Sequence, residues 1–462
     1  MAHRSRAGAV AAFIVALACP AAAHAQAAAP SACQDFYTSV NASWLRRASA
    51  EVRTILATSR RLPEGSRDTV RADTIRIDAF TAIGAEVQRT LRRILDRARV
   101  AAATSGDSLV KVVGTYYASC LAAAPADSAE AAATDGGVRR CIEATDRDLG
   151  IALGWLYVKE ILSPTAQRRV IALTEQLRAA MDARLRANPW MTAETKAAAR
   201  AKLAAMVFRV ANPDSAKDYG RLVLSPTDFA ANRRAVKYVT YQRSLHDMAG
   251  MGDKQQWLFR QYFVNAAYFP QKNTLEVPAV MLQPPYFDSS DDVAENYAGI
   301  GYVIGHEITH AFDPQGALYD ATGAMRNWWV SSDRAAFAAR SELLVAQYDR
   351  YRVRDSVGVN GPLTLNENVA DLGGLNIALD AYRAGRPPGA ARDQRFFRAY
   401  AAIWRSAGSP ERDIRLARED VHAPDQWRVN GVLANMPAFA RAFGCRAGDA
   451  MVRAPKDLVD IW

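Results

Sequence analysis

The chain has 462 residues, half of them hydrophobic, and its 58 lysines and arginines outnumber its 48 aspartates and glutamates, for a formal net charge of +10. This length and composition favour a globular protein with a large core, and they exclude a disordered chain. The basic residues form pairs but no tract of five or more, so we expect a solvated basic surface and no nucleic-acid partner.

The first 25 residues have the pattern of a cleaved secretory signal. Two arginines precede an apolar run from Ala7 to Ala18, and Ala-His-Ala at 23–25 is a small-x-small cleavage site. An apolar run of about twelve residues is too short to span a bilayer, and no later stretch reaches the roughly eighteen that a membrane helix needs. We therefore expect an exported protein, periplasmic or extracellular, that begins near Gln26 and has no transmembrane segment. Cys19 leaves a lipoprotein anchor as the alternative.

Four cysteines follow the signal, and they are Cys33, Cys120, Cys141 and Cys445. An even number of cysteines in an exported protein favours two disulfides, and four cysteines allow three pairings. None of them forms a Cys-x-x-Cys pair, so the sequence does not indicate a thiolate metal site.

Apolar residues at three- and four-residue steps predict amphipathic helices at 75–103, 149–161 and 166–187. The Ala-rich stretch 122–137 has few large apolar residues and predicts a linker or a surface loop. Thr192 precedes the first turn of a further helix. The stretch 273–280 predicts an extended segment, which Pro284 and Pro285 end.

The stretch GYVIGHEITHAF at 301–312 contains two of the six histidines in the chain. On a helix, His306 and His310 lie on one face with their Cβ atoms about 6 Å apart, a spacing that suits two imidazoles binding one zinc ion. Glu307 then points beside the metal, where a carboxylate acts as the general base on a zinc-bound water. The alternative is that two buried histidines fall one helical turn apart by chance, because so short a pattern also arises by accident.

A zinc hydrolase needs a third protein ligand and an open position for water. In the stretch NENVADLGGLNIALDAY, Glu367 and Asp371 are four residues apart at the start of an apolar-periodic helix. Glu367 is a candidate zinc ligand, and Asp371 is a candidate acceptor of a hydrogen bond that would orient a zinc histidine. Acidic residues in a first helical turn are also favoured by the helix dipole, so this pair has a structural alternative.

With these two segments in view, the chain resembles the neprilysin and endothelin-converting-enzyme family of zinc metallopeptidases. The resemblance also includes CQDFYTSVNASW near the start, VNAAYFPQKN, LQPPYFD, DVHAPDQWRVNGVLANMPAF and the ending AFGCRAGDAMV, in the family's order. It implies a mainly α fold with a small β-sheet, that of a thermolysin-like (gluzincin) catalytic domain, and one zinc ion per chain. It also implies helices at 26–120 that pack on a catalytic domain at 141–462, with a short loop at 121–140 between them.

The resemblance implies a role for each candidate residue in peptide hydrolysis. The family's zinc ligands are matched by His306, His310 and Glu367, and the base that activates water is matched by Glu307. Asp371 matches an acid that supports a zinc histidine. His422 matches a histidine that stabilises the oxyanion, and Arg428 matches an arginine that binds a substrate carbonyl.

Substrate contacts are also implied. Asn265 and the main chain of Ala266 match the extended edge that hydrogen-bonds the substrate peptide in the family, a mode in which main-chain pairing gives affinity. The pocket for the residue after the scissile bond is matched by Met281, Tyr286, Tyr302, Val303 and Trp404. Without the resemblance, these five residues would be interpreted as core residues.

Three features depart from the family's pattern. Ala267 stands where the family has a tyrosine beside the substrate edge, and Gly84 stands where it has an arginine that supports recognition of a terminal carboxylate. The third is a gap, because Cys120 and Cys141 are only 21 positions apart, where the family inserts a largely helical domain over the active site. The resemblance still implies the disulfides Cys120–Cys141 and Cys33–Cys445.

The sequence therefore predicts an exported zinc-dependent endopeptidase or oligopeptidase that cleaves on the amino side of hydrophobic residues. Peptides are the expected partners, and the sequence leaves the oligomeric state open. The alternative is a zinc-binding scaffold or peptide-binding protein whose activity was lost with the inserted domain. Against this alternative, every residue that the chemistry requires is present. With so little cover, we expect an open cleft that also admits unfolded proteins.

Overall fold

The computed structural model describes residues 29–59, 72–123, 136–211, 219, 222–249, 257–290, 293–354, 357–387 and 389–462. The expected signal at 1–25 and most of the expected loop at 121–140 lie outside these residues. Helices dominate the described part, and its strands form three small sheets, which confirms the mainly α class. None of the described helices combines the length and the hydropathy that a membrane span requires.

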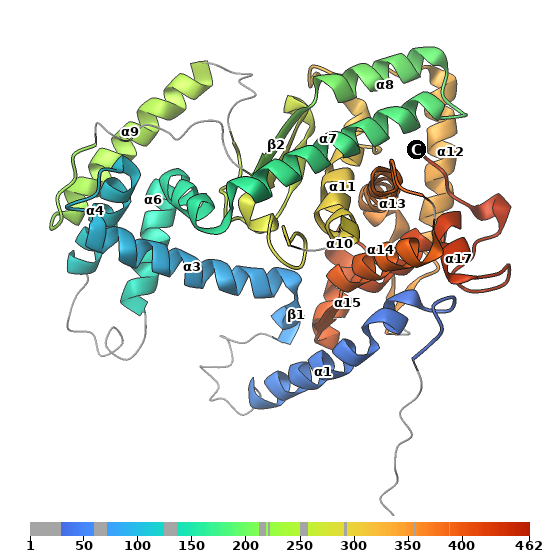
Figure 1. Cartoon of the computed structure of the whole chain (residues 1–462), viewed down its shortest axis with the longest axis horizontal. Coiled ribbons are helices and arrows are strands. Elements are labelled where there is room, and N and C mark those ends of the chain that lie inside the picture. The colour runs from blue at the N-terminus through green and yellow to red at the C-terminus, as the bar shows by residue number, and fades with distance from the viewer. Residues whose placement is uncertain are drawn as a thin grey trace, which may run out of the picture.

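Helices α11 (Tyr302–His310) and α13 (Gly361–Arg383) pack against each other at the centre of the molecule (Figure 1). Two glycines let their backbones touch. A Cβ atom on Gly305 would lie 2.7 Å from the oxygen of Gly374, and one on Gly374 would lie 2.5 Å from the amide nitrogen of His306. A larger residue at either position would push the helices apart. This close contact brings the histidines of α11 beside the carboxylates of α13.

Helix α13 begins earlier than the sequence indicated. Asn360 caps it, because its side chain accepts a hydrogen bond from the N–H of Leu363. Glu367 therefore lies in the second turn of the helix, and Asp371 one turn further on. The helix dipole acts mainly within the first turn, so it does not account for these two carboxylates.

Further helices surround this pair. Helix α7 (Pro164–Ala187) packs on both α11 and α13, while α12 (Ser331–Tyr348) packs on α13 and α8 (Ala193–Ala205) packs on α7. The side chain of Thr192 caps α8, as its place in the sequence predicted. Just before α11, α10 (Val293–Asn296) continues through a single π-helical segment, Tyr297–Gly301.

The N-terminal helices lie to one side of this centre (Figure 1), and they are α3 (Ala79–Ala101), α4 (Ser108–Ala123), α6 (Gly136–Ile161) and α9 (Phe229–Ala249). The helix predicted from residue 75 starts only at Ala79, because Asp78 caps it and closes strand β1 (Arg76–Asp78). The helix predicted from Leu149 starts instead at Gly136, and Leu149 is a kink inside it. The disulfide Cys120–Cys141 joins α4 to α6.

A three-stranded sheet has the order β2–β4–β3. Strand β4 (Thr274–Pro278) lies within the predicted extended segment, and it pairs in parallel with β2 (Val207–Ala211) and antiparallel with β3 (Ala267–Phe269). Among the described strands, β3 pairs on one side only, so it is the edge of the sheet. Two smaller sheets pair β1 with β7 (Ser406–Gly408) and β5 (Arg352–Val353) with β6 (Val357–Gly358).

The start of the described chain lies against helices from its C-terminal part. Helix α1 (Phe36–Ser59) packs on a C-terminal group of helices, which are α14 (Ala390–Ile403), α15 (Pro410–Glu419), α16 (Asp425–Leu433) and α17 (Pro437–Phe443) (Figure 1). The disulfide Cys33–Cys445 joins the start of α1 to the end of α17. The main-chain N–H of Tyr37 donates to Asn430 on α16. Helix α1 thereby supports the helix that carries Arg428.

Candidate metal centre

Three side chains from α11 and α13 converge at the helix contact. The Nε2 atoms of His306 and His310 lie 2.9 Å apart, and the Oε2 atom of Glu367 lies 3.2 Å from the first and 3.5 Å from the second. The potential ligand atoms of the three residues all lie within 4.8 Å of one another. His306 is buried and the other two residues are half-buried, so the group is accessible from one side.

The far nitrogen of each imidazole faces a carboxylate. His306 Nδ1 lies 2.8 Å from Asp371 Oδ1, and His310 Nδ1 lies 2.6 Å from Asp313 Oδ2. An imidazole that carries its hydrogen on Nδ1, facing its carboxylate, keeps a lone pair on Nε2, and both Nε2 atoms lie within 3.5 Å of Oε2 of Glu367. Three electron-pair donors this close together repel one another, and a cation between them removes that repulsion. Two imidazoles and one carboxylate, each imidazole backed by a carboxylate, are a donor set that suits zinc.

Asp371 belongs to a buried network beneath this centre. Its two oxygens accept hydrogen bonds from Nε and Nη2 of Arg428, at 2.8 and 2.6 Å, and one also accepts from the hydroxyl of Tyr302. Although burial raises the pKa of Asp371, the charge of Arg428 and the hydrogen bond from His306 lower it further, to well below its usual range. Asp371 therefore stays charged and holds His306 in one tautomer. The guanidinium of Arg428 also lies over the ring of Trp404, 4.0 Å from its centre.

Glu307 lies between the metal centre and the edge strand. The residue is 5% exposed, and its carboxyl group accepts a hydrogen bond from the main-chain N–H of Tyr268 on β3. Within the described part of the chain, its Oε2 atom has no hydrogen-bond partner. Burial raises the pKa of Glu307, which makes the carboxylate a stronger proton acceptor than it would be in water. These are the surroundings that a general base requires.

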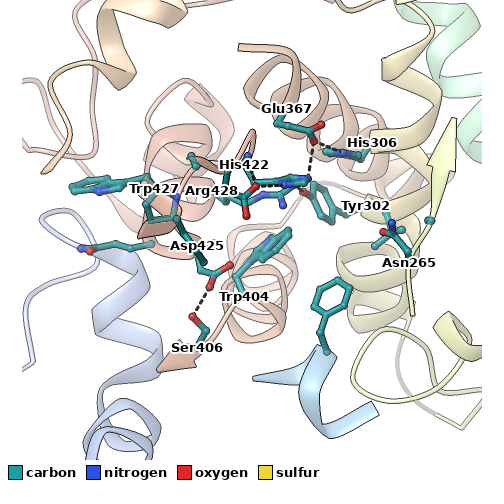
Figure 2. A pocket seen from close by; sticks show the side chains of 18 of the residues that line it. Asn265, Tyr302, His306, Glu367, Trp404, Ser406, His422, Asp425, Trp427 and Arg428 are labelled. Carbon is teal, nitrogen blue, oxygen red and sulfur yellow. Dashed lines mark hydrogen bonds and ion pairs between the residues drawn. The ribbon is translucent and has the colours of Figure 1, made fainter. Parts of the chain in front are cut away.

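His422 approaches the same centre from the loop between α15 and α16. Its Nε2 atom lies 3.2 Å from Oε2 of Glu367, and its Nδ1 atom lies 2.8 Å from Asp420. In Figure 2, Glu367, His306 and His422 lie together, with Tyr302, Trp404 and Arg428 beneath them. Sequence reasoning missed both Asp313 and Asp420. Their positions in the sequence could have indicated them, because Asp313 follows His310 by three residues and Asp420 precedes His422 by two.

The metal centre lines a cleft of about 910 Å³. All the residues predicted to contact substrate line it, and they are Asn265, Ala266, Met281, Tyr286, Tyr302, Val303, Trp404 and Arg428. Phe80 also lines it and meets the ring of Tyr286 edge to face, with the ring centres 5.8 Å apart. The five residues predicted for the pocket are core residues as well. Met281, Tyr286, Tyr302 and Trp404 are buried, and Val303 is partly buried against the same core. At Gly84, a Cβ atom would meet no heavy atom within 4 Å.

Comparison with known proteins identifies the family. A model of peptidase family M13 matches residues 265–459, and a second model of the same family matches residues 127–213. This chain belongs to peptidase family M13. The M13 chain is 35% identical over 335 residues to human endothelin-converting enzyme-like 1, across 69% of this chain and 43% of that protein. It is 33% identical over 336 residues to neprilysin-1 of Caenorhabditis elegans, across 67% of this chain and 44% of that one. The predicted resemblance is therefore confirmed.

Solved structures of the M13 type share the fold. The zinc metalloprotease Zmp1 of Mycobacterium tuberculosis, in complex with an inhibitor, matches at a TM-score of 0.63 and 37% identity, over 71% of this chain and 51% of that chain. PepO of Lactobacillus rhamnosis matches at a TM-score of 0.63 and 34% identity, over 71% and 52%. The M13 chain thus spans less than half the length of the curated relatives described above and about half of these solved chains.

Proposed function

We propose that this protein is an exported zinc-dependent endopeptidase or oligopeptidase that hydrolyses peptide bonds on the amino side of hydrophobic residues. The observation that carries the proposal is the convergence of His306, His310 and Glu367 in a cleft, with both histidines held by carboxylates. We assign these three residues as the ligands of one zinc ion. When bound there, zinc supplies a Lewis acid that polarises a water molecule and the peptide carbonyl.

The remaining residues act around that centre. Glu307 is the general base, because it lies beside the proposed ligands and one oxygen of its buried carboxylate has no hydrogen-bond partner among the described residues. His422 donates a hydrogen bond to the carbonyl oxygen as negative charge develops on it. Asp371 fixes the orientation of His306, and Arg428 keeps Asp371 charged while it binds a substrate carbonyl from the cleft wall.

Substrate selection follows from the edge strand and the pocket. A peptide that runs along the free side of β3 exchanges hydrogen bonds with Asn265 and the main chain of Ala266. The side chain after the scissile bond then enters the pocket that Tyr286, Tyr302 and Trp404 line, where aromatic and aliphatic surface favours a hydrophobic residue. Gly84 offers no charged group, so recognition of a terminal carboxylate has no support from this position.

The proposal also covers the domain organisation. Helices within residues 26–120 pack on a catalytic domain at 141–462, and the stretch 121–140 stands in place of a larger insertion. The predicted loop is shorter than 121–140, because α4 extends to Ala123 and α6 begins at Gly136. The cleft should therefore accept long, unfolded chains as well as short peptides. Digestion of a reduced and denatured protein, followed by mass spectrometry of the fragments, tests this point and reports the residue after each cut. Cleavage confined to short peptides would contradict the open cleft.

A quenched-fluorescent peptide assay tests the core of the proposal. Activity should disappear with a chelator and return with zinc, and Glu307→Gln should lower kcat by about 100- to 10,000-fold while zinc stays bound. Glu295→Gln is the matched control, because Glu295 pairs with Arg395 and does not line the cleft. A wild-type protein that binds zinc but cleaves nothing would favour the scaffold alternative, and full activity of Glu307→Gln would refute the mechanism.

A further inference from the structure

Lys202 is a buried cation that the proposed chemistry does not use. It lies on α8, is 1% exposed, and its Nζ atom donates to the main-chain oxygens of Ala311 (2.6 Å), Gly316 (2.8 Å) and Tyr319 (2.6 Å). All three acceptors belong to the segment that follows α11. Burial lowers the pKa of Lys202 to about 7, but three acceptors match the three N–H groups of the charged ammonium.

The same segment carries Asp313, the residue that holds His310. One oxygen of Asp313 accepts hydrogen bonds from the N–H groups of Gln315 (2.8 Å) and Gly316 (2.6 Å), and the other faces His310 Nδ1 at 2.6 Å. Gly316 belongs to both sets of contacts, since its N–H donates to Asp313 while its oxygen accepts from Lys202. The segment is therefore fixed by an anion through its amides and by a cation through its carbonyls.

We propose that Lys202 is a positioning residue for the metal centre, because it fixes the 311–319 segment in the conformation that lets Asp313 orient His310. This inference rests on the proposed zinc function. Without the ammonium, all three buried carbonyl oxygens would lose a donor, although the oxygen of Gly316 would keep its hydrogen bond from the N–H of Tyr319 (3.0 Å). Losing donors to buried oxygens is unfavourable, so the segment would relax. That relaxation would move Asp313 and release the imidazole from its tautomer and orientation.

Three aromatic rings enclose the ammonium of Lys202. The rings of Tyr268, Phe312 and Trp328 surround Nζ, with their centres 5.9, 5.7 and 5.6 Å away. Their faces stabilise a cation and leave the enclosed space apolar. We therefore expect the loss of Lys202 to be transmitted to the metal centre.

Two measurements on Lys202→Met test the inference. The first is its zinc affinity, measured by competition with a chromogenic chelator, and the second is the visible absorption of the Co²⁺-substituted protein. Loss of a group that orients a metal ligand costs about 10- to 100-fold in affinity or activity. We expect a zinc Kd raised at least tenfold, an altered Co²⁺ spectrum, and a lower kcat with KM little changed. Wild-type protein that fails to bind zinc would refute the proposed function. If the wild type binds zinc and Lys202→Met binds it equally well, only the role of Lys202 is refuted.

Asn232→Leu is the control for a purely structural effect. Asn232 is also buried, and it donates to Ser119 and Ser225 among the N-terminal helices. The Asn232→Leu variant should have a lower Tm, with the zinc Kd and the Co²⁺ spectrum unchanged. If Lys202→Met does not fold, Lys202→Gln keeps two N–H donors and should give an intermediate zinc Kd. A folded Lys202→Gln with wild-type zinc affinity and spectrum would overturn the proposal.

Discussion

Replacing Arg428 with methionine tests whether the ion pair beneath the metal centre is required for its structure. Asp371 is fully buried, and Arg428 donates to both of its oxygens, at 2.8 and 2.6 Å. Methionine is also long and unbranched but has no donor, so Asp371 would keep only its contacts with His306 and Tyr302. Removing one partner of a buried ion pair costs about 3–5 kcal/mol. This is on the order of two to four powers of ten in the folding equilibrium.

Urea unfolding measures this loss, with a chelator present so that zinc release does not contribute. The double variant Asp371→Asn with Arg428→Met should be more stable than Arg428→Met alone, because it no longer buries an unpaired charge. A loss below about 1 kcal/mol, or a double variant that is less stable than the single one, would refute this reasoning.

The same pair predicts a dependence on pH. Because the folded pKa of Asp371 is lowered, its contribution to stability is present above the unfolded pKa of about 3.9 and is lost as the pH falls through the folded value. In Arg428→Met the folded pKa rises, so the stability attributable to Asp371 should be lost at a higher pH than in the wild type. Unfolding midpoints between about pH 3 and 7 measure the difference.

Three other variants test separate parts of the structure. Gly374→Ala places a Cβ atom against the amide nitrogen of His306, so we expect a loss of about 1–3 kcal/mol in urea unfolding and weaker zinc binding by chelator competition. Replacing Cys33 and Cys445 together with serine should cost about 2–5 kcal/mol in urea unfolding, and an unchanged midpoint would contradict a stabilising role. Val303→Phe should narrow the pocket and shift kcat/KM from leucine towards alanine after the scissile bond by about 10- to 200-fold, measured on paired peptides.

Much of the helical structure could be predicted from the sequence, because apolar periodicity and caps are local signals. Thr192 was expected just before a helix, and its side chain caps α8. The helix boundaries were harder to predict, because capping residues and strand pairing compete with the helix for the same residues. The predicted helix from residue 75 loses its first residues because Asp78 caps α3 and residues 76–78 pair with β7. Pairing with a strand more than three hundred residues away has no signal in a local window.

The candidate site was predictable only in part. The spacing of His306 and His310 indicated a metal site, but their approach to Glu367 depends on how α11 packs on α13, and the glycines that allow this contact have many other uses. The pocket residues could not be separated from core residues, because their side chains serve both purposes. Tyr302 illustrates this, since its ring lines the cleft while its hydroxyl donates to Asp371.

Main-chain acceptors explain why the sequence could not show the role proposed for Lys202. Its three hydrogen bonds reach carbonyl oxygens, which every residue type possesses, so nothing at positions 311, 316 or 319 marks them as partners of a lysine 109 to 117 positions earlier. Of these three positions, only 316 restricts the residue type, because a Cβ atom on Gly316 would lie 1.8 Å from the oxygen of His310. A side-chain partner such as Asp313 can be recognised by its charge and its distance from a histidine. Main-chain hydrogen bonds that support a metal centre therefore cannot be predicted from residue types and can be identified only in the folded structure.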